Sequence, residues 1–379
     1  MNTIRADILV VGAGIAGLSV AGTLASRGQI KVVVLEQEDH PGFHATGRSA
    51  AILVEGYGTP LVRQLTSFSR PILEGEGEGD PSRSVLRSRG VLYVALKGAA
   101  PSQMVEEGGS ISRLTACAAE DLVPALDVDG IDHAFYDPTA ADIDVHALQT
   151  RYLQMVRAHG GEVLTGTALT AAQWTGSLWQ ISAGEHQVEA RVVINASGAW
   201  AGEVGRLFNA QPIALEPRRR SAAIVATDSE EDPNGWPMVV DLGETIYFKP
   251  EGGKLMISPA DETPSPPCDA YPDDLDIAFA VDRFEKLTRR TVRRVTHRWA
   301  GLRTFAPDRN PVLGRDGLAP NFFWHAGQGG VGVQTAPVTA QILTDLILER
   351  RTSRALEVIN LAQLSPHRFL PAMAATSKG

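Results

Sequence analysis

Cysteine is scarce in this sequence, which contains only two among 379 residues. Cys117 and Cys268 lie far apart and form no CxxC pair, so the sequence predicts neither a disulfide framework nor a zinc cluster. Such usage is typical of a reducing compartment. We therefore expect a cytoplasmic protein without a structural metal ion.

Excess positive charge is also missing. The chain has 35 Lys and Arg against 44 Asp and Glu, a formal net charge of −9. Nucleic acids and anionic membranes bind basic surfaces, so neither is an expected partner. Four arginines at 289, 290, 293 and 294 stand alone in this acidic chain, and we interpret them as a solvated face. A small molecule is the expected ligand.

No uninterrupted apolar run reaches membrane-spanning length. The most apolar stretch, Ala6 to Ala25, contains four glycines, and Arg27 follows it. We interpret it as protein core rather than as a signal peptide or a membrane span. With 44% hydrophobic and 21% charged residues, the chain has globular composition, and its length predicts two domains.

The sequence begins with a pattern for dinucleotide binding. An apolar strand is predicted at 7–11, a helix to about Gly28 and a second strand at 31–36, which together form one βαβ unit. Residues 12–17 read GAGIAG, a GxGxxG motif that allows a tight turn and close approach to a pyrophosphate. Glu36 lies nineteen residues after Gly17, where a carboxylate can accept hydrogen bonds from ribose hydroxyls. The alternative is a glycine-rich turn without a ligand, and the motif leaves NAD and FAD both open.

Two further turns favour FAD. The small residues Ala196-Ser197-Gly198 follow a predicted strand at 191–195, although an ordinary strand-helix turn would look the same. The stretch 327–332, GQGGVG, lies between a strand at 321–325 and a helix at 333–350. Its backbone N–H groups and the helix N-terminus could stabilise the negative charge of a reduced flavin.

The remaining patterns indicate a two-domain α/β protein. Strands are predicted at 90–96, 221–225 and 245–248, and a helix at 144–158. We predict a Rossmann-type, doubly wound FAD-binding domain from residues 1–82, 140–212 and 296–379. An α+β substrate domain with a mixed sheet would comprise 83–139 and 213–295. Exposed loops are expected at 74–80 and 263–268.

Longer strings carry a family resemblance. VVGAGIAG with VVVLE, PGFHATGRSAA at 41–51, YGTP at 57–60 and HAGQGGVG at 325–332 resemble the D-amino acid oxidase-like FAD superfamily, which includes glycine and sarcosine oxidases. The resemblance spans nearly the whole chain. The segments 136–144, 217–222, 236–238, 247–250 and 299–303 look most like bacterial D-arginine dehydrogenases.

This resemblance implies the cofactor and its contacts. Sarcosine oxidases attach flavin through a cysteine, and none lies near 303–320 here, so noncovalent FAD is expected. The implied FAD-binding positions are Gly12, Gly14, Ile15, Ala16, Gly17, Glu36, Gln37, His44, Thr46, Arg48, Ser49, Ala50, Ala51, Ser197, Gly198, Trp200, Gly327, Gly329, Gly330, Val331 and Gly332.

The resemblance also implies a clamp for a substrate carboxylate. The matching residues, defined here as the clamp, are Tyr57, Arg220, Tyr247 and Arg303, with the Gly330 backbone nearby. A guanidinium pairs bidentately with a carboxylate, and tyrosine hydroxyls complete its hydrogen bonding. Taken singly, each of these side chains could instead serve packing.

Three positions depart from the relatives. Val91 stands where the D-arginine dehydrogenases have a glutamate for the substrate guanidinium, and Ile52 stands where they have a histidine. The pocket is therefore expected to be apolar, and arginine and lysine are expected to be poor substrates. Met256 aligns with the lysine that promotes reaction with oxygen in sarcosine oxidases, although Lys254 lies on the same strand face.

Three functional hypotheses remain. The first is a D-amino acid dehydrogenase that moves hydride from Cα–H of a neutral or apolar substrate to flavin N5, giving a 2-oxo acid and ammonia after hydrolysis. The second is an oxidase or demethylase of N-substituted amino acids. The third is a flavin-binding subunit without catalysis. The electron acceptor, whether quinone, dye or oxygen, stays open.

Overall fold

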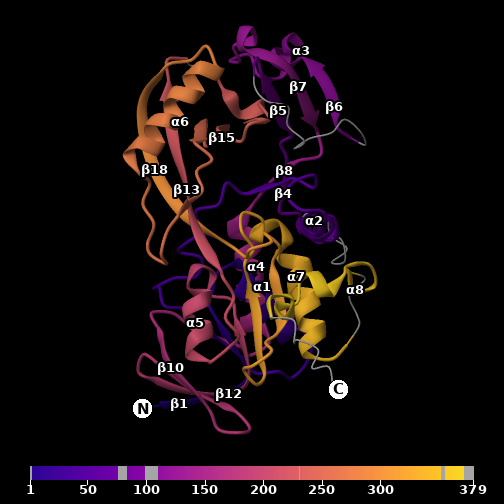
Figure 1. The fold of residues 1–379 in the computed structure, drawn as a ribbon, viewed down its shortest axis with the longest axis vertical. Helices are drawn as coiled ribbons and strands as arrows, with labels where there is room; N and C mark the ends of the chain where they lie inside the picture. The colour runs from indigo at the N-terminus through magenta and orange to yellow at the C-terminus, as the bar shows by residue number, and fades with distance from the viewer. Residues whose placement is uncertain (1, 76–82, 99–109, 230, 351–354, 371–379) are drawn as a thin grey trace, which may run out of the picture.

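Two large sheets lie at opposite ends of an elongated molecule (Figure 1). The computed structural model describes residues 2–75, 83–98, 110–229, 231–350 and 355–370. The first sheet is built from strands in three separate segments of the chain, 2–35, 162–195 and 312–326, and the second from strands in the segments 91–137 and 216–305.

The first sheet has a parallel centre. β1 pairs in parallel with β12 on one side and with β2 on the other, and β9 extends the sheet beyond β2. β12 pairs along its other edge first with antiparallel β11 and then with parallel β20. The strands are β1 (Asn2–Val11), β2 (Val32–Leu35), β9 (Glu162–Leu164), β10 (Leu169–Trp174), β11 (Trp179–Ala183), β12 (His186–Asn195), β19 (Val312–Arg315) and β20 (Phe322–Ala326).

Helices cover both faces of this sheet, as a doubly wound fold requires. α1 (Ile15–Ala25) packs between α4 (Val145–Ala158) and α7 (Gly332–Ile347), and α2 (Pro60–Leu73) packs on α7. On the opposite face, α5 (Ala201–Leu207) shares a core with Trp179, Phe208 and Trp324. The predicted βαβ unit is confirmed, because β1, α1 and β2 are consecutive and the strands are parallel.

The second sheet is mixed, as predicted, and most of its strand pairs are antiparallel. Its order is β17-β13-β16-β15-β14-β5-β7-β6, and β18 pairs along β13. α6 (Asp274–Leu287) packs on it through Phe284, whose ring meets Phe248 at 5.2 Å. The strands of this sheet and its short helix α3 are β5 (Val91–Leu96), β6 (Ser112–Thr115), α3 (Ala116–Leu122), β7 (Ile131–Asp137), β13 (Glu216–Thr227), β14 (Met238–Asp241), β15 (Tyr247–Glu251), β16 (Lys254–Ser258), β17 (Thr263–Pro264) and β18 (Val292–Phe305). The short helix α8 (Ala355–Val358) instead packs on α7 beside the first sheet.

A small three-stranded sheet lies between the two large ones (Figure 1). It comprises β3 (Ile52–Leu53), β8 (Ala141–Ile143) and β4 (Leu86–Ser88). Asp142 of β8 accepts from Lys249 Nζ at 3.0 Å and from Arg89 Nε at 2.7 Å. The Lys249 pair joins the small sheet to β15, and the Arg89 pair joins it to the two-residue link between β4 and β5, so the small sheet is anchored to the second sheet.

The predicted domain boundary at 296 and the two predicted loops agree with the structure only in part. β18 belongs to the second sheet over its whole length, although the predicted domain boundary at 296 runs through it. The loop prediction at 263–268 was wrong at its start, because Thr263 and Pro264 pair with Arg219 and Arg218 of β13. The loop prediction at 74–80 lies mostly outside the described residues. The domain division stays a prediction.

Several sequence expectations concern absences. Across the described ranges, no helix combines the length and apolar character needed to cross a bilayer. Within the same ranges, no group of three His, Cys, Asp or Glu side chains could hold a metal ion. Cys117 and Cys268 are both free thiols.

His325 provides a test of burial on β20. Its imidazole is 1% exposed, and burial lowers its pKa from 6.5 to about 4. Between pH 6.5 and about 4, the imidazole is protonated in the unfolded chain but neutral in the folded protein. The contribution of His325 to the free energy of unfolding is therefore fully present above pH 6.5 and is lost as the pH falls toward 4. We expect His325→Phe to flatten the pH dependence of the unfolding free energy over this range by about 3 kcal/mol. Urea unfolding of both proteins at several pH values measures this difference. An equal change of the unfolding free energy with pH in the two proteins would contradict the prediction.

Candidate active site

Three cavities follow one another between the two sheets. The first has a volume of about 390 Å³, the second about 130 Å³ and the third about 100 Å³. Residues shared between neighbouring cavities show that the three are adjacent. The first and second share Gly14, Ala45, Thr46, Arg48, Ala196, Gly198, Gly301 and Leu302. The second and third share Ala50, Arg220, Tyr247, Arg303 and Gly330.

The glycine-rich turn at 12–17 borders the first cavity. Gly12 has φ +101°, and a Cβ there would lie 2.6 Å from the Ala196 carbonyl oxygen. A Cβ on Gly17 would lie 1.8 Å from the Gly12 carbonyl oxygen. The turn therefore requires glycine for its backbone conformation and for its contact with the first helical turn.

Gly17→Ala is expected to weaken FAD binding at least tenfold, because the added methyl group displaces the Gly12 turn. Equilibrium dialysis and flavin absorbance of the purified variant measure this loss. Gly202→Ala in α5 is the matched control, since its Cβ would meet no atom within 4 Å. Unchanged FAD affinity in Gly17→Ala would show that the turn does not hold the cofactor.

Glu36 directly follows β2, the second strand of the βαβ unit, and lines the first cavity. Its Oε2 accepts from the Ala13 N–H at 2.7 Å, and its Oε1 accepts from the Glu38 N–H at 3.0 Å. These bonds fix the carboxylate at the place where the sequence predicted a ribose contact. Each oxygen retains a lone pair for a ligand hydroxyl.

His44 and Thr46 lie in the segment after β2. His44 Nε2 lies 2.8 Å from Glu38 Oε1, and its ring packs on Trp200 at 4.6 Å. Thr46 Oγ1 accepts from the Ile15 N–H at 3.0 Å, which satisfies one free donor at the start of α1. Both side chains line the first cavity.

Most of the predicted FAD positions line the first two cavities, and four do not. Gly17 and Ala51 are set back behind the walls, and so are Gly327 and Val331 of the second turn. The other predicted positions on these walls are Gly12, Gly14, Ile15, Ala16, Glu36, Gln37, His44, Thr46, Arg48, Ser49, Ala50, Ser197, Gly198, Trp200, Gly329, Gly330 and Gly332. Their individual cofactor contacts stay predictions.

Arg48 has protein partners that the sequence did not indicate. Its Nη1 donates to the carbonyls of Ala300 at 3.0 Å and Ala270 at 3.1 Å, and its Nη2 pairs with Asp269 at 2.5 Å. Arg48 thus ties the segment after β2 to β18 and to the loop before α6. It also borders the first and second cavities.

Sequence reasoning missed the far wall of the first cavity. Thr167, Ala168 and Leu169 line it, where the chain leaves β9 and enters β10. Parallel strand ends meet at one edge of such a sheet, so the short strand at 162–164 was the available signal. Cys268 also lines this cavity, away from the clamp.

The clamp residues meet at the second and third cavities. Arg220, Tyr247 and Arg303 line both, and Tyr57 lines the third. β13 and β18 carry the two arginines side by side, since Arg220 pairs in register with Gly301. Residues 83 positions apart in sequence therefore share one site.

Of the two clamp arginines, Arg220 has acceptors among the described residues and Arg303 has none. Its half-buried guanidinium makes no hydrogen bond or ion pair with any residue that the structure describes. Burial and the charge of Arg220 lower the pKa of Arg303. Burial opposes ionisation of Tyr247, but the charges of Arg303 and Arg220 outweigh it and lower the Tyr247 pKa. An anion between the two guanidiniums would relieve their repulsion.

The wall of the third cavity is mostly apolar. Ile52 and Val91 both line it, together with Val54, Met238 and Val240. Met256 lines the second cavity, whereas Lys254 is exposed at the start of β16. These side chains line the cavities, and their correspondence to the positions in the relatives stays a prediction.

Sequence reasoning also missed two ionisable residues on this wall, Tyr93 and Glu244. Tyr93 is buried on β5, and burial together with the charge of Asp137 raises its pKa. Glu244 is exposed and has φ +50°, in a turn held by Asp241, which accepts from the Thr245 and Ile246 N–H groups. The pocket is thus not wholly apolar, because a carboxylate borders it.

The fold and the cavity beside the glycine turn are those of a flavin-dependent oxidoreductase. The chain belongs to the FAD dependent oxidoreductase family, whose model matches residues 7–346. FAD is its cofactor, and the glycine turn, the Glu36 carboxylate and the adjoining second cavity suit that ligand.

Known proteins agree with this assignment over nearly the whole chain. FAD-dependent oxidoreductase domain-containing protein 1 from Xenopus laevis is 26% identical, covering 96% of this chain and 83% of that protein. Glycine oxidase from Geobacillus kaustophilus has a similar fold, with a TM-score of 0.82 at 20% identity, covering 97% of this chain and 100% of the other. L-proline dehydrogenase from P. horikoshii also has a similar fold, with a TM-score of 0.79 at 20% identity, covering 93% of this chain and 96% of the other. The particular likeness to D-arginine dehydrogenases stays a prediction.

Proposed function

We propose that this protein oxidises D-amino acids with neutral, mostly apolar side chains to 2-oxo acids and ammonia. The observation that carries the proposal is the Arg303 guanidinium, which is half buried, lacks an acceptor among the described residues and faces a cavity beside Arg220. A carboxylate is the small anion that such a pair binds best, through parallel N–H···O bonds. The apolar wall of Ile52, Val54 and Val91 would then receive the side chain.

The chain contributes positioning and charge. Arg220, Arg303 and the hydroxyls of Tyr57 and Tyr247 would fix the carboxylate, which places Cα toward the second cavity. When bound, FAD supplies the hydride acceptor. The backbone of the 327–332 turn and the N-terminus of α7 border that cavity and would favour negative charge there. We assign no catalytic base, since an amine that enters deprotonated needs none.

Met256 favours a dehydrogenase over an oxidase. It places a thioether on the wall of the second cavity where the sarcosine oxidases are expected to have an ammonium group, and Lys254 is exposed. The electron acceptor would then be a quinone or a dye rather than oxygen. We also propose that FAD is noncovalent, so acid precipitation should release it into the supernatant.

A second candidate is an oxidase or demethylase of N-substituted amino acids. The same clamp would serve it, and one structural relative is a glycine oxidase while another is an L-proline dehydrogenase, whose substrate is a secondary amine. A non-catalytic flavin subunit is a third candidate, but it gives no purpose to an Arg303 guanidinium that has no acceptor in the described part of the chain.

Anaerobic bleaching of the flavin separates these candidates. We expect D-leucine to bleach the purified protein faster than L-leucine, D-arginine or sarcosine, and an artificial dye to restore the colour faster than oxygen. Preference for sarcosine or glycine would favour the second candidate. Absence of bleaching by every amino acid would favour the third.

A further inference from the structure

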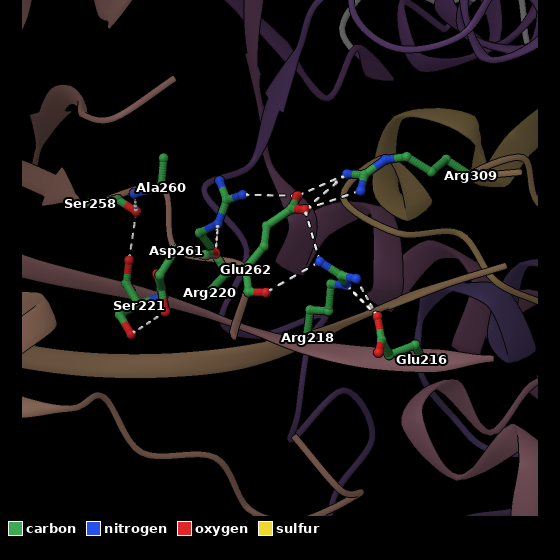
Figure 2. A network of polar contacts seen from close by, with 9 residues as sticks. All are labelled: Glu216, Arg218, Arg220, Ser221, Ser258, Ala260, Asp261, Glu262 and Arg309. Carbon is green, nitrogen blue, oxygen red and sulfur yellow. Dashed lines mark hydrogen bonds and ion pairs between the residues drawn. The ribbon is translucent and has the colours of Figure 1, made fainter. Parts of the chain in front are cut away.

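A second charged pair, Glu262 and Arg309, lies directly beside the clamp. Figure 2 shows the Glu262 carboxylate between the guanidiniums of Arg220 and Arg309. Arg220 Nη2 lies 3.3 Å from Glu262 Oε1, its single contact with that carboxylate. Glu262 is therefore an internal carboxylate within reach of the group proposed to bind the substrate's carboxylate.

Arg309 holds Glu262 by both oxygens. Its Nη2 lies 2.9 Å from Oε1 and its Nη1 lies 3.1 Å from Oε2, a bidentate arrangement. The Arg309 guanidinium also rests 4.1 Å above the Phe305 ring, which stabilises its position. Bidentate charge-assisted pairs are stronger than single long contacts, so Glu262 is bound mainly to Arg309.

The backbone around Glu262 is fixed independently of that pair. Ser221 donates to the Asp261 carboxylate from its N–H at 2.6 Å and from its hydroxyl at 2.9 Å. Ser258 Oγ donates to the Ser221 carbonyl at 2.6 Å, and the Asp261 carbonyl accepts from Arg220 Nε at 2.7 Å. The Glu262 side chain, with three rotatable bonds, can still change partners on this fixed backbone.

Glu262 keeps its negative charge in this setting. Burial would raise its pKa, but the Arg309 hydrogen bonds and the charges of Arg309, Arg220 and Arg303 outweigh burial and lower it. Without Arg309, the cations near Glu262 among the residues that the structure describes are Arg218, Arg220 and Arg303, and Arg218 is already paired with Glu216. The freed carboxylate would then turn to the clamp arginines.

We propose that Arg309 is a positioning residue that keeps Glu262 from pairing fully with Arg220, so that the charge of the clamp remains available for the substrate carboxylate. Glu262 is then an internal competitor that Arg309 restrains. This inference rests on the proposed role of the clamp and adds a determinant that no clamp residue supplies.

The test uses the FAD-loaded protein and 4-methyl-2-oxopentanoate, a carboxylate with an apolar side chain. Binding is read from the flavin absorbance change, and D-leucine kinetics are measured in parallel. In Arg309→Gln we expect the Kd of the 2-oxo acid and the KM of D-leucine to rise at least tenfold, with kcat within about threefold of the unmodified protein. In the double variant Glu262→Gln/Arg309→Gln, both values should return to within about threefold, because the competitor has lost its charge.

Arg298→Gln is the matched control, as it removes an exposed arginine of β18 that pairs with Asp274. Arg309→Lys keeps the charge, so its Kd for the 2-oxo acid and its KM for D-leucine should lie between those of Arg309→Gln and of the unmodified protein. This second variant keeps the test valid if Arg309→Gln misfolds. Unchanged binding in Arg309→Gln, or a double variant as weak as the single one, would overturn the inference. If the unmodified protein and an Arg303 variant bind the 2-oxo acid equally, the clamp itself is refuted, which is a different result.

Discussion

Arg303→Leu is expected to lower kcat/KM for the best amino acid by about 10³-fold while FAD stays bound. The guanidinium faces the second and third cavities, has no acceptor among the described residues and lies beside Arg220. Losing one partner of a desolvated charge pair costs about 2–5 kcal/mol, and 4 kcal/mol corresponds to about three powers of ten. Steady-state kinetics with D-leucine and a dye acceptor measure the change.

Arg303→Lys separates charge from geometry. A lysine retains the positive charge but cannot form two parallel bonds, so we expect a loss of about tenfold to 10²-fold. Arg298→Leu on the same strand serves as the control, because it removes an exposed arginine away from the cavities. If Arg303→Leu binds FAD fully and its kcat/KM lies within threefold of that of the unmodified protein, the clamp is refuted. A fall in flavin content would instead point to a structural role.

The βαβ unit could be predicted because its signals are local. β1, the 12–17 turn, α1 and β2 follow one another within 36 residues. The apolar run indicates a strand buried in the sheet, and the glycine spacing indicates a tight turn that a pyrophosphate can approach. Glu36 was found by its distance from that turn. Its exact partners, the N–H groups of Ala13 and Glu38, depend on backbone geometry that spacing alone does not give.

The clamp could be predicted only through resemblance. Arg220 and Arg303 come from two strands whose pairing brings together residues distant in sequence, and no periodicity reports that pairing. Glu262 and Arg309, 47 residues apart, meet through two loops, and neither has a pattern that marks it. Glu244 was missed for a similar reason, because its turn is set by Asp241 hydrogen bonds rather than by a glycine or proline signal.

Val91→Glu is expected to change the preferred side chain of the substrate. Val91 is 1% exposed on β5 and lines the third cavity next to Met238, its partner on β14. A carboxylate in this apolar wall is costly when unpaired, and a substrate guanidinium would give it a partner. We expect the kcat/KM ratio of D-arginine to D-leucine to rise at least 10²-fold, about 3 kcal/mol of discrimination, with a loss of about 2–4 kcal/mol in folding stability.

Val91→Gln is the matched control, because glutamine has nearly the volume of glutamate without its charge. This variant should weaken D-leucine turnover and raise the kcat/KM ratio of D-arginine to D-leucine less than tenfold. A larger rise in Val91→Glu would then be due to charge pairing. Equal ratios in the two variants would show that the wall selects by shape. If the unmodified protein already prefers D-arginine, the apolar reading of Val91 and Ile52 is wrong. Glu244, the carboxylate already on that wall, then becomes the residue that receives the guanidinium, and Glu244→Gln should abolish the preference.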